Sequence, residues 1–306
     1  NVSQPAPKDV MKTQGKASGG FQNAIFIAGE ARLLCAFKSG SVRRPPTDRS
    51  ARPHTPDHTP DRTPNRTSHP TSLALQVGIL EMPTRKWNMI CTGAHTDTVF
   101  SAAFQPANAD RLATCSFDGS VRLWRTPTNT LEKEMVGEDV GVLYSLVWAP
   151  EGCGDEEQIA TCSSRGLLGI WNTATGVLLR RINFTTGNGS EKREVPLFCV
   201  DWAPDGKTLA VASLDNACHV VRVDGTVVRR LKHPAGCFGV AFCPLQPGVL
   251  ASSCADGAVR IWELGSDYGA GAAAKTQSAT PTATFKGHEK RTFMVAWSPL
   301  LAHALL

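Results

Sequence analysis

The sequence predicts an all-β protein built from a repeated unit of four strands. The first observation is a recurring phrase, in which an apolar strand, a tight turn and a second strand follow one another. The clearest copy is LATCSFDGSVRLWR at 112–125, where Asp118-Gly119 is a strong hairpin signal. Further copies occupy 159–172, 209–222 and 250–263. Such a repeat determines the fold class before any single residue is considered.

An aromatic-X-Pro triplet is the second recurring feature, and it ends the strand that precedes each phrase. Proline ends this strand because it has no N–H to donate to a neighbour. The prolines are 44, 54, 40 and 55 residues apart, at Pro106, Pro150, Pro204, Pro244 and Pro299. The two long intervals contain insertions at 183–194 and 265–284. With a fourth strand after each phrase, the pattern predicts four strands in each unit of roughly 40–45 residues.

The remaining segments suggest how the chain is divided. Residues 1–20 are polar and without periodicity, which predicts a disordered lead-in. Residues 21–92 predict a damaged first unit, interrupted at 42–72 by a Pro/Thr-rich insertion that cannot form a strand ladder. Four units should occupy 93–286, and 287–306 should be the truncated start of another. We therefore expect a fragment of a larger protein, or an open arc of sheets.

Charge and hydropathy exclude two classes of partner. The chain of 306 residues has a net charge of +5, but residues 1–72 account for +6 and the repeats for −1. The repeats thus lack the clustered positive charge of a nucleic-acid surface, and we expect no nucleic-acid partner. No run of about 18 apolar residues is present, so we expect no membrane insertion.

The ten cysteines indicate a reducing compartment. They include no CxxC pair, and five fall on predicted strands, where cysteine acts as a small buried hydrophobic residue. These five are Cys115, Cys162, Cys199, Cys243 and Cys254. We expect them to be reduced and the protein to be intracellular, in the cytoplasm.

The repeats resemble the WD40-repeat family. The residues that carry the resemblance are Gly93-Ala-His95, Gly287-His288, Trp124-Arg125, Trp171-Asn172 and Trp262-Glu263. The resemblance implies a partial WD40-type β-propeller, with about four complete blades plus fragments and a disordered N-terminal region. Longer phrases such as GILEMPTRKWNM and GHEKRTFMVAWSPL resemble, within that family, the WD repeat-containing protein 17 family. That finer resemblance implies many WD repeats followed by a helical region.

One set of polar residues could be mistaken for a Ser-His-Asp catalytic group: His95, Ser116, Asp118 and Trp124. No nucleophile elbow accompanies it. The resemblance implies instead a structural tetrad that locks one blade by hydrogen bonds. A partial tetrad follows at His233, Asp256 and Trp262, with Cys254 in the place of the serine. In the second full unit Arg165 stands at the aspartate position, so we expect no tetrad there.

Two further motifs do not predict a cofactor or a metal. The stretch from Gly269 to Lys275 is similar to a phosphate-binding loop, but Ala274 stands where a glycine is needed before the lysine. His54, His58 and His69 lie in the Pro/Thr-rich stretch without a rigid scaffold for a metal. We therefore expect no cofactor, no metal and no enzymatic activity.

The expected function is a non-enzymatic scaffold whose partners are proteins of unknown identity. The alternative is a substrate-recruiting subunit of a ubiquitin ligase. The resemblance implies an arginine three residues after the tryptophan in such subunits. Pro127, Ala174 and Gly265 occupy those positions, which argues against the alternative.

Overall fold

The computed structural model describes most of the repeat region. Backbone and side chains are described for residues 94–106, 108–153, 157–187, 191–265, 268, 280–298 and 305. Only the backbone of four strands is described before residue 94. The Pro/Thr-rich insertion, its three histidines and the stretch from Gly269 to Lys275 lie outside the described residues.

The described residues form five four-stranded antiparallel sheets, each with its strands in chain order. The first consists of β1 (Phe21–Phe26), β2 (Arg32–Phe37), β3 (Gln76–Glu81) and β4 (Lys86–Ile90). The second consists of β5 (Val99–Gln105), β6 (Asn108–Ser116), β7 (Ser120–Arg125) and β8 (Thr130–Val136). The third consists of β9 (Leu143–Trp148), β10 (Gln158–Ser163), β11 (Leu167–Asn172) and β12 (Leu178–Asn183).

The other two sheets follow a short hairpin. That hairpin pairs β13 (Thr185–Thr186) with β14 (Arg193–Glu194) within the predicted insertion at 183–194. The fourth sheet consists of β15 (Leu197–Trp202), β16 (Thr208–Ser213), β17 (Ala217–Arg222) and β18 (Val227–Lys232). The fifth consists of β19 (Cys237–Phe242), β20 (Val249–Cys254), β21 (Ala258–Glu263) and β22 (Ala283–Lys286).

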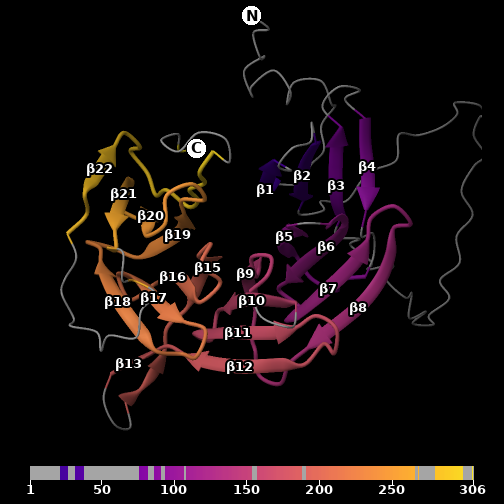
Figure 1. The fold of residues 1–306 in the computed structure, drawn as a ribbon, viewed down its shortest axis with the longest axis horizontal. Helices are drawn as coiled ribbons and strands as arrows, with labels where there is room; N and C mark the ends of the chain where they lie inside the picture. Colours follow the sequence, from indigo (N-terminus) through magenta and orange to yellow (C-terminus); the bar gives the residue numbers. More distant parts are fainter. Residues whose placement is uncertain are drawn as a thin grey trace, which may run out of the picture.

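The sheets stand side by side in an open arc, with the first strand of each sheet on the inside and the fourth on the outside (Figure 1). The inner strands β5, β9, β15 and β19 contact one another in that order. The described strands thus have the architecture of β-propeller blades, as the sequence predicts. The division of the chain at residues 20, 92 and 286 stays a prediction.

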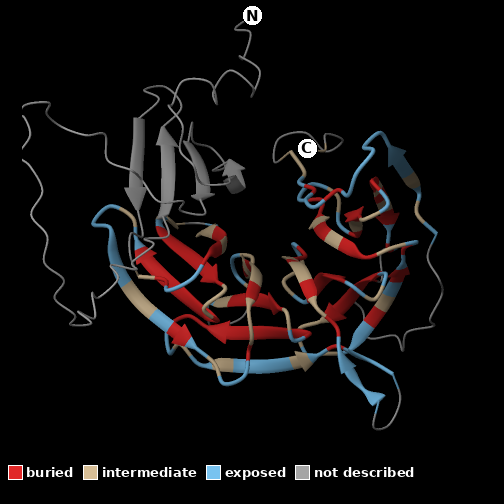
Figure 2. Cartoon of the chain, turned by 180° about the vertical axis from the view of Figure 1, so that it is seen from behind, coloured by how far each residue is buried: buried red, intermediate tan, exposed pale blue. Residues whose placement is uncertain are grey.

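Burial follows the position of each strand within its sheet. All six residues of β11 and of β16 are buried, whereas β8, β12 and β22 are largely exposed (Figure 2). The middle strands are buried because each sheet packs its two faces against its neighbours. This explains their continuous apolar runs, in contrast to the alternating pattern of a half-exposed strand.

The aromatic residue of the aromatic-X-Pro triplet joins neighbouring sheets. The Trp148 indole N–H donates to the Ala103 carbonyl of the previous inner strand at 2.8 Å. Trp297 repeats this bond to the Ala241 carbonyl at 2.9 Å. Residues 292–297 therefore follow β19 in the position that β9 takes after β5.

The structure bears on the expectations about the cysteines and about membrane insertion. Cys243 is buried but lies just beyond the end of β19, because Pro244 ends the strand there. None of the eight cysteines with described side chains forms a disulfide. No helix among the described residues is long and apolar enough to cross a membrane.

Candidate functional site

A chain of hydrogen bonds runs through the interior of the β5–β8 sheet. The Trp124 Nε1–H donates to Thr114 Oγ1 at 3.0 Å, and the Thr114 hydroxyl donates to His95 Nε2 at 2.7 Å. The His95 Nδ1–H then donates to Asp118 Oδ2 at 3.0 Å. An imidazole with its proton on Nδ1 satisfies all these bonds. Trp124, Thr114 and His95 are buried, so these bonds tie the two strands β6 and β7 to the loop before β5 and to the turn at Asp118.

Thr114, not Ser116, holds the central place in this set. The structure brings together His95, Asp118 and Trp124 as the sequence suggests, but the expected serine does something else. The Ser116 hydroxyl donates to the Asp97 carbonyl at 2.9 Å and accepts the Asp118 N–H at 3.1 Å. Ser116 thus closes the hairpin turn and makes no bond to the histidine or the indole.

The electrostatics of this set favour a structural role. Burial alone would raise the pKa of Asp118, but hydrogen bonds from His95 and Ser120 hold that pKa well below its usual range. The carboxylate is therefore charged and engaged at neutral pH. Thr114 is completely buried, so its hydroxyl cannot reach a substrate. The arrangement can lock a sheet, and it offers no exposed nucleophile.

The β19–β22 sheet holds a variation of the same set. Ser252 accepts the Trp262 N–H and binds His233 Nε2, both at 2.8 Å, so Ser252 rather than position 254 supplies the hydroxyl. Asp256 does not reach His233. It forms two bonds with Arg260, at 2.5 and 3.2 Å.

The cross-strand neighbour explains why Asp256 takes a different partner. Arg122 pairs across the sheet with Glu134 and donates to it, and its guanidinium approaches Asp118 only to 3.8 Å, so Asp118 remains within hydrogen-bond distance of His95. Arg260 pairs instead with Thr284, which offers no charge. The arginine therefore turns to the aspartate of its own hairpin.

The two remaining units keep only parts of the set. In the β9–β12 sheet Trp171 still donates to Thr161 at 2.9 Å, although Arg165 replaces the aspartate. In the β15–β18 sheet Val211 and Val221 replace both the hydroxyl and the indole. In these four sheets the hydroxyl at this position occurs together with the tryptophan. This fits the free-energy cost of a buried indole N–H that has no acceptor.

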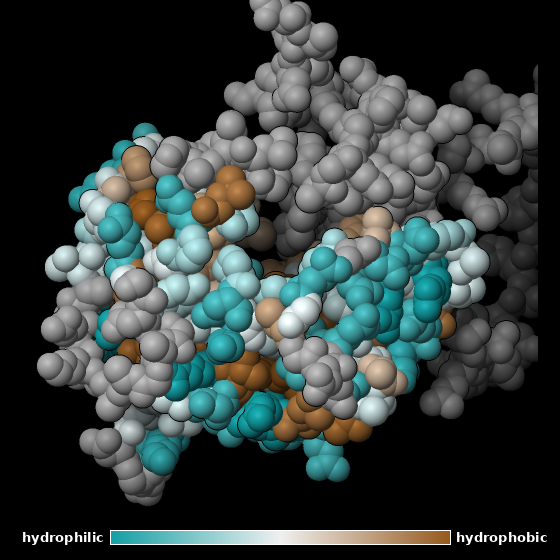
Figure 3. Space-filling model, in the orientation of Figure 1, coloured by the Kyte–Doolittle hydropathy of each residue, from teal (hydrophilic) through white to brown (hydrophobic). Residues whose placement is uncertain are grey.

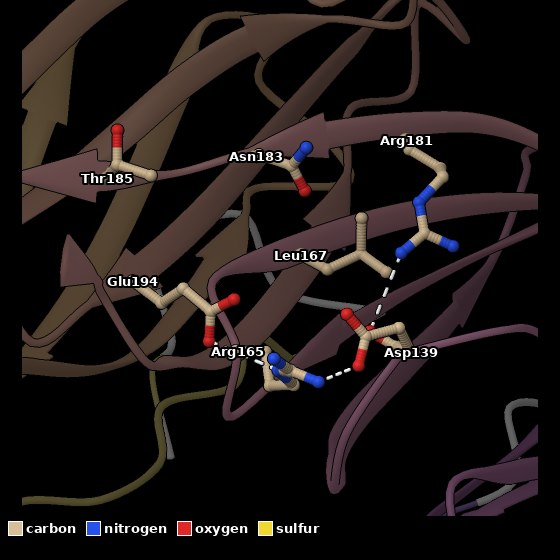
Figure 4. A pocket seen from close by; sticks show the side chains of 7 residues that line it. All are labelled: Asp139, Arg165, Leu167, Arg181, Asn183, Thr185 and Glu194. Atoms are coloured by element: carbon tan, nitrogen blue, oxygen red, sulfur yellow. Dashed lines mark hydrogen bonds and ion pairs between the residues drawn. The ribbon is translucent and has the colours of Figure 1, made fainter. Parts of the chain in front are cut away.

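A small charged pocket lies at one end of the β9–β12 sheet. Its lining is Asp139, Arg165, Leu167, Arg181, Asn183, Thr185 and Glu194 (Figure 4). Arg165 lies between two carboxylates: it forms an ion pair with Asp139 and another with Glu194, at 3.2 Å. Arg181 donates to the Glu138 carbonyl at 2.7 Å. The charges in this pocket are therefore compensated from within, and it does not indicate an anion or cation site.

A row of aromatic rings crosses from sheet to sheet along the inner strands. We name this row the aromatic arc, and it consists of Phe100, Tyr144, Phe198, Phe238 and Phe293. The centroids of successive rings are 5.4, 5.2, 4.8 and 5.0 Å apart. Phe117 adds a second ring at one end, 5.3 Å from Phe100. The first three contacts along the arc each join two different sheets, and the fourth joins Phe238 of β19 to Phe293, which follows the last sheet.

A β-bulge places each of the first four rings. The pairing of inner and second strand skips one residue near the start of the inner strand, between Val99 and Ser101 in β5. The skipped residue there is Phe100, and in the other three sheets it is Tyr144, Phe198 and Phe238. A bulged residue is released from the alternation of the strand, so its side chain can turn out of the core. These four rings are partly exposed, and Phe293 is 60% exposed.

The aromatic arc lies on one side of the molecule, which we name the loop face. On this side the loops that precede the inner strands meet the turns between second and third strands. The Phe117 N–H donates to the Thr98 carbonyl, and the Leu214 N–H donates to the Pro196 carbonyl, at 2.9 and 3.0 Å. Leu214, in the turn between β16 and β17, adds exposed apolar area on this side, with 47% of the residue exposed. Figure 3 shows one face of the molecule, on which hydrophilic residues predominate and hydrophobic residues form separate patches.

The aromatic arc was missed in reasoning from the sequence, although the sequence holds a signal for it. Each ring stands four residues before the aromatic of a triplet, as Phe100 stands before Phe104. The pattern shows that an aromatic is repeated. It does not show the bulge that exposes the ring.

The comparisons with known proteins agree with the propeller architecture. Residues 87–125 and 225–263 match the model of the WD domain, G-beta repeat. Residues 159–237 match the Anaphase-promoting complex subunit 4 WD40 domain. The chain thus carries WD40 repeats, and these matches support its place in the WD40-repeat family.

Two curated proteins are similar to this chain over a short stretch. Coronin-7 of Rattus norvegicus is 35% identical over 63 residues, and coronin-7 of Mus musculus is 36% identical over 63 residues. The aligned part is 21% of this chain and 7% of each coronin-7. These matches give no support to the finer resemblance to WD repeat-containing protein 17, which stays a prediction.

Proposed function

We propose that this chain is a non-enzymatic scaffold that binds other proteins through the aromatic arc on its loop face. The observation that carries the proposal is the run of partly exposed rings that crosses from β5 to Phe293. WD40 repeats themselves indicate a protein-interaction scaffold. The aromatic arc gives that general role a location.

Aromatic rings suit this role because they provide large contact areas with few rotatable bonds. Phe and Tyr are enriched at the cores of protein interfaces. Here the rings stand on bulges of buried strands, so little entropy is lost when a partner covers them. His95 binds Asp118, His233 binds Ser252 and Asp256 binds Arg260, so these groups are engaged within their own sheets and have a structural role.

Two finer expectations have less support. No arginine stands at Pro127, Ala174 or Gly265, and no described surface favours a ubiquitin-ligase subunit. That the chain belongs to a larger multi-propeller protein also stays a prediction. The size of the native protein on an immunoblot, compared with 32.8 kDa, checks it.

We also propose an intracellular, cytoplasmic location. The support is that none of the eight cysteines with described side chains forms a disulfide, and six of them are fully or almost fully buried. Cell fractionation with an antibody against the repeats tests this proposal. Recovery of the protein only from the medium or from vesicle interiors would contradict it.

Affinity capture with variants tests the scaffold role. The tagged chain and its Phe293→Ala and Phe285→Ala variants are expressed in the same cells, and the bound proteins are compared. Phe285 is the matched control, because it is 58% exposed like Phe293 but lies on the outer strand β22. We expect Phe293→Ala to lose captured proteins that Phe285→Ala keeps. Equal capture by all three chains, or capture of nothing by the unaltered chain, would contradict the proposal.

A further inference from the structure

The loop face carries charges of opposite sign at the two ends of the aromatic arc. The residue three positions before each ring occupies the same place in each repeat, just before the inner strand or its equivalent. It is an aspartate at the first ring and a lysine at the last, with uncharged residues between. In order, these residues are Asp97, Gly141, Val195, Ala235 and Lys290.

Both end charges are available to a partner. Asp97 and Lys290 are exposed, whereas the three residues between them are partly or fully buried. Arg291 and Glu289 are exposed on either side of Lys290, so residues 289–291 carry one net positive charge. The other charges near the middle, Asp139, Arg165 and Glu194, are already paired in the charged pocket.

We propose that the aromatic arc binds an extended segment of a partner protein that has an apolar middle and opposite charges at its two ends. A basic side chain of the segment lies over Asp97, and an acidic side chain lies over Lys290. The inference rests on the proposed scaffold function and specifies the partner's chemistry. The partner segment is inferred from the charges along the arc, which are negative beside the first ring and positive beside the last.

The dimensions of the aromatic arc determine the length of the segment. Four steps between rings, each near 5 Å, separate Phe100 from Phe293. An extended chain advances about 3.3–3.6 Å per residue, so roughly six residues cover this path. Proline or large apolar side chains in the middle would bury their surface against the rings.

The basic end of the segment gains a second interaction. Phe100 and Phe117 are stacked 5.3 Å apart at the end where Asp97 lies. A guanidinium or ammonium group bound there can contact a ring face as well as the carboxylate. At the other end Lys290 and Arg291 can pair with a carboxylate beside the exposed ring of Phe293, and their two positive charges outnumber the one negative charge of Glu289.

A randomised peptide library tests the proposal directly. A phage-displayed library of eight-residue peptides is selected against the immobilised 306-residue chain and, in parallel, against its Asp97→Lys variant. We expect the unaltered chain to enrich peptides with an apolar middle, a basic residue near one end and an acidic residue near the other. The Asp97→Lys chain should enrich peptides with acidic residues near both ends. Enrichment without this charge order, or the same enrichment by both chains, would overturn the proposal.

Binding of the selected peptides then locates the surface. Fluorescence anisotropy should show at least tenfold weaker binding to Phe293→Ala and unchanged binding to Phe285→Ala. A second copy of this chain is the competing occupant. Self-association that the Phe293→Ala variant abolishes, measured by sedimentation velocity, would overturn the proposal. If affinity capture depends on Phe293 while the peptides show no charge order, the scaffold function stands and this inference fails.

Discussion

The rings of Phe198 and Phe238 lie 4.8 Å apart, although the two residues belong to different sheets. Each is the bulged residue of its inner strand. The same bulge in successive units therefore produces a continuous surface that no single unit contains. This explains how a repeated strand pattern can build one binding surface out of residues spaced a whole unit apart.

The bond between Thr114 and Trp124 predicts a measurable coupling. Thr114→Val should destabilise the chain by about 2–4 kcal/mol, because two buried groups lose their partner. Trp124→Phe removes the donor, so Thr114→Val should cost about 1 kcal/mol less in that background. Urea unfolding of the two single variants and the double variant measures this coupling. Additive costs would show that the two side chains do not act through this bond.

The hairpin glycines predict a contrast between two alanine variants. Gly166 and Gly152 both have positive φ, at 69° and 71°. A Cβ on Gly166 would lie 2.4 Å from the Phe184 carbonyl oxygen, whereas a Cβ on Gly152 would meet nothing within 4 Å. Gly152→Ala should cost only the strain of the left-handed conformation, about 1–2 kcal/mol. Gly166→Ala should cost at least about 1 kcal/mol more, because the loop that leads to the next inner strand must move.

Thermal unfolding of both glycine variants provides the test. Equal losses would mean that backbone strain alone decides the cost, and that the turn and the following loop are not tightly packed.

His233 predicts a loss of stability in acid. Burial lowers the pKa of this imidazole to about 4. Since that pKa is below its unfolded value, the unfolded chain takes up the proton first. The stabilising contribution is therefore complete above about pH 6.5 and is lost as the pH falls through about 4, by about 1–3 kcal/mol.

Unfolding free energies between pH 7 and pH 4 test the role of His233. A His233→Gln variant should show a smaller fall over this range than the unaltered chain. His288→Gln is the control, since His288 is exposed, and it should leave the profile unchanged. Identical profiles for all three chains would contradict the prediction.

Asp201 predicts an effect of the opposite sign. Its carboxylate accepts the Phe242 N–H of the next sheet at 2.6 Å, and burial raises its pKa to about 6. The folded chain therefore holds this proton more tightly, and the resulting stability is present below about pH 4 and lost as the pH rises through 6. An amide keeps an acceptor without the buried charge.

Asp201→Asn should consequently stabilise the chain by about 1–2 kcal/mol at pH 8 and change little at pH 4. Asp110→Asn, which changes an exposed carboxylate, should leave the stability unchanged at both pH values. Chemical unfolding at the two pH values measures the difference. A variant that is less stable at pH 8 would show that the charge itself holds β15 to β19.

The sequence predicted the sheets well because the repeat and the turns are local signals. The turn Asp118-Gly119 and the aromatic-X-Pro triplets mark where strands begin and end. The sequence predicts Ser116 as the source of the hydroxyl, whereas Thr114 supplies it in the structure; the two residues lie on the same side of β6, two positions apart. A comparison between units could have decided it. The hydroxyl stands ten residues before the tryptophan at 114, 161 and 252, and Val211 stands there where Val221 replaces the tryptophan.

The aromatic arc could not be predicted from local patterns alone. Whether Phe100 is buried or exposed depends on the bulge, and the bulge depends on how β5 pairs with β6. The contact between Tyr144 and Phe198 further depends on how two sheets stand side by side. Exposure and proximity are thus properties of the assembled sheets.

A photo-crosslinking measurement tests the aromatic arc most directly. The photoreactive amino acid p-benzoylphenylalanine is incorporated at position 293 in one preparation and at position 285 in another, and both chains are irradiated in the cells that express them. The account predicts a crosslinked protein partner for position 293 and none for position 285. A partner crosslinked at position 285 alone, or equally at both, would contradict it.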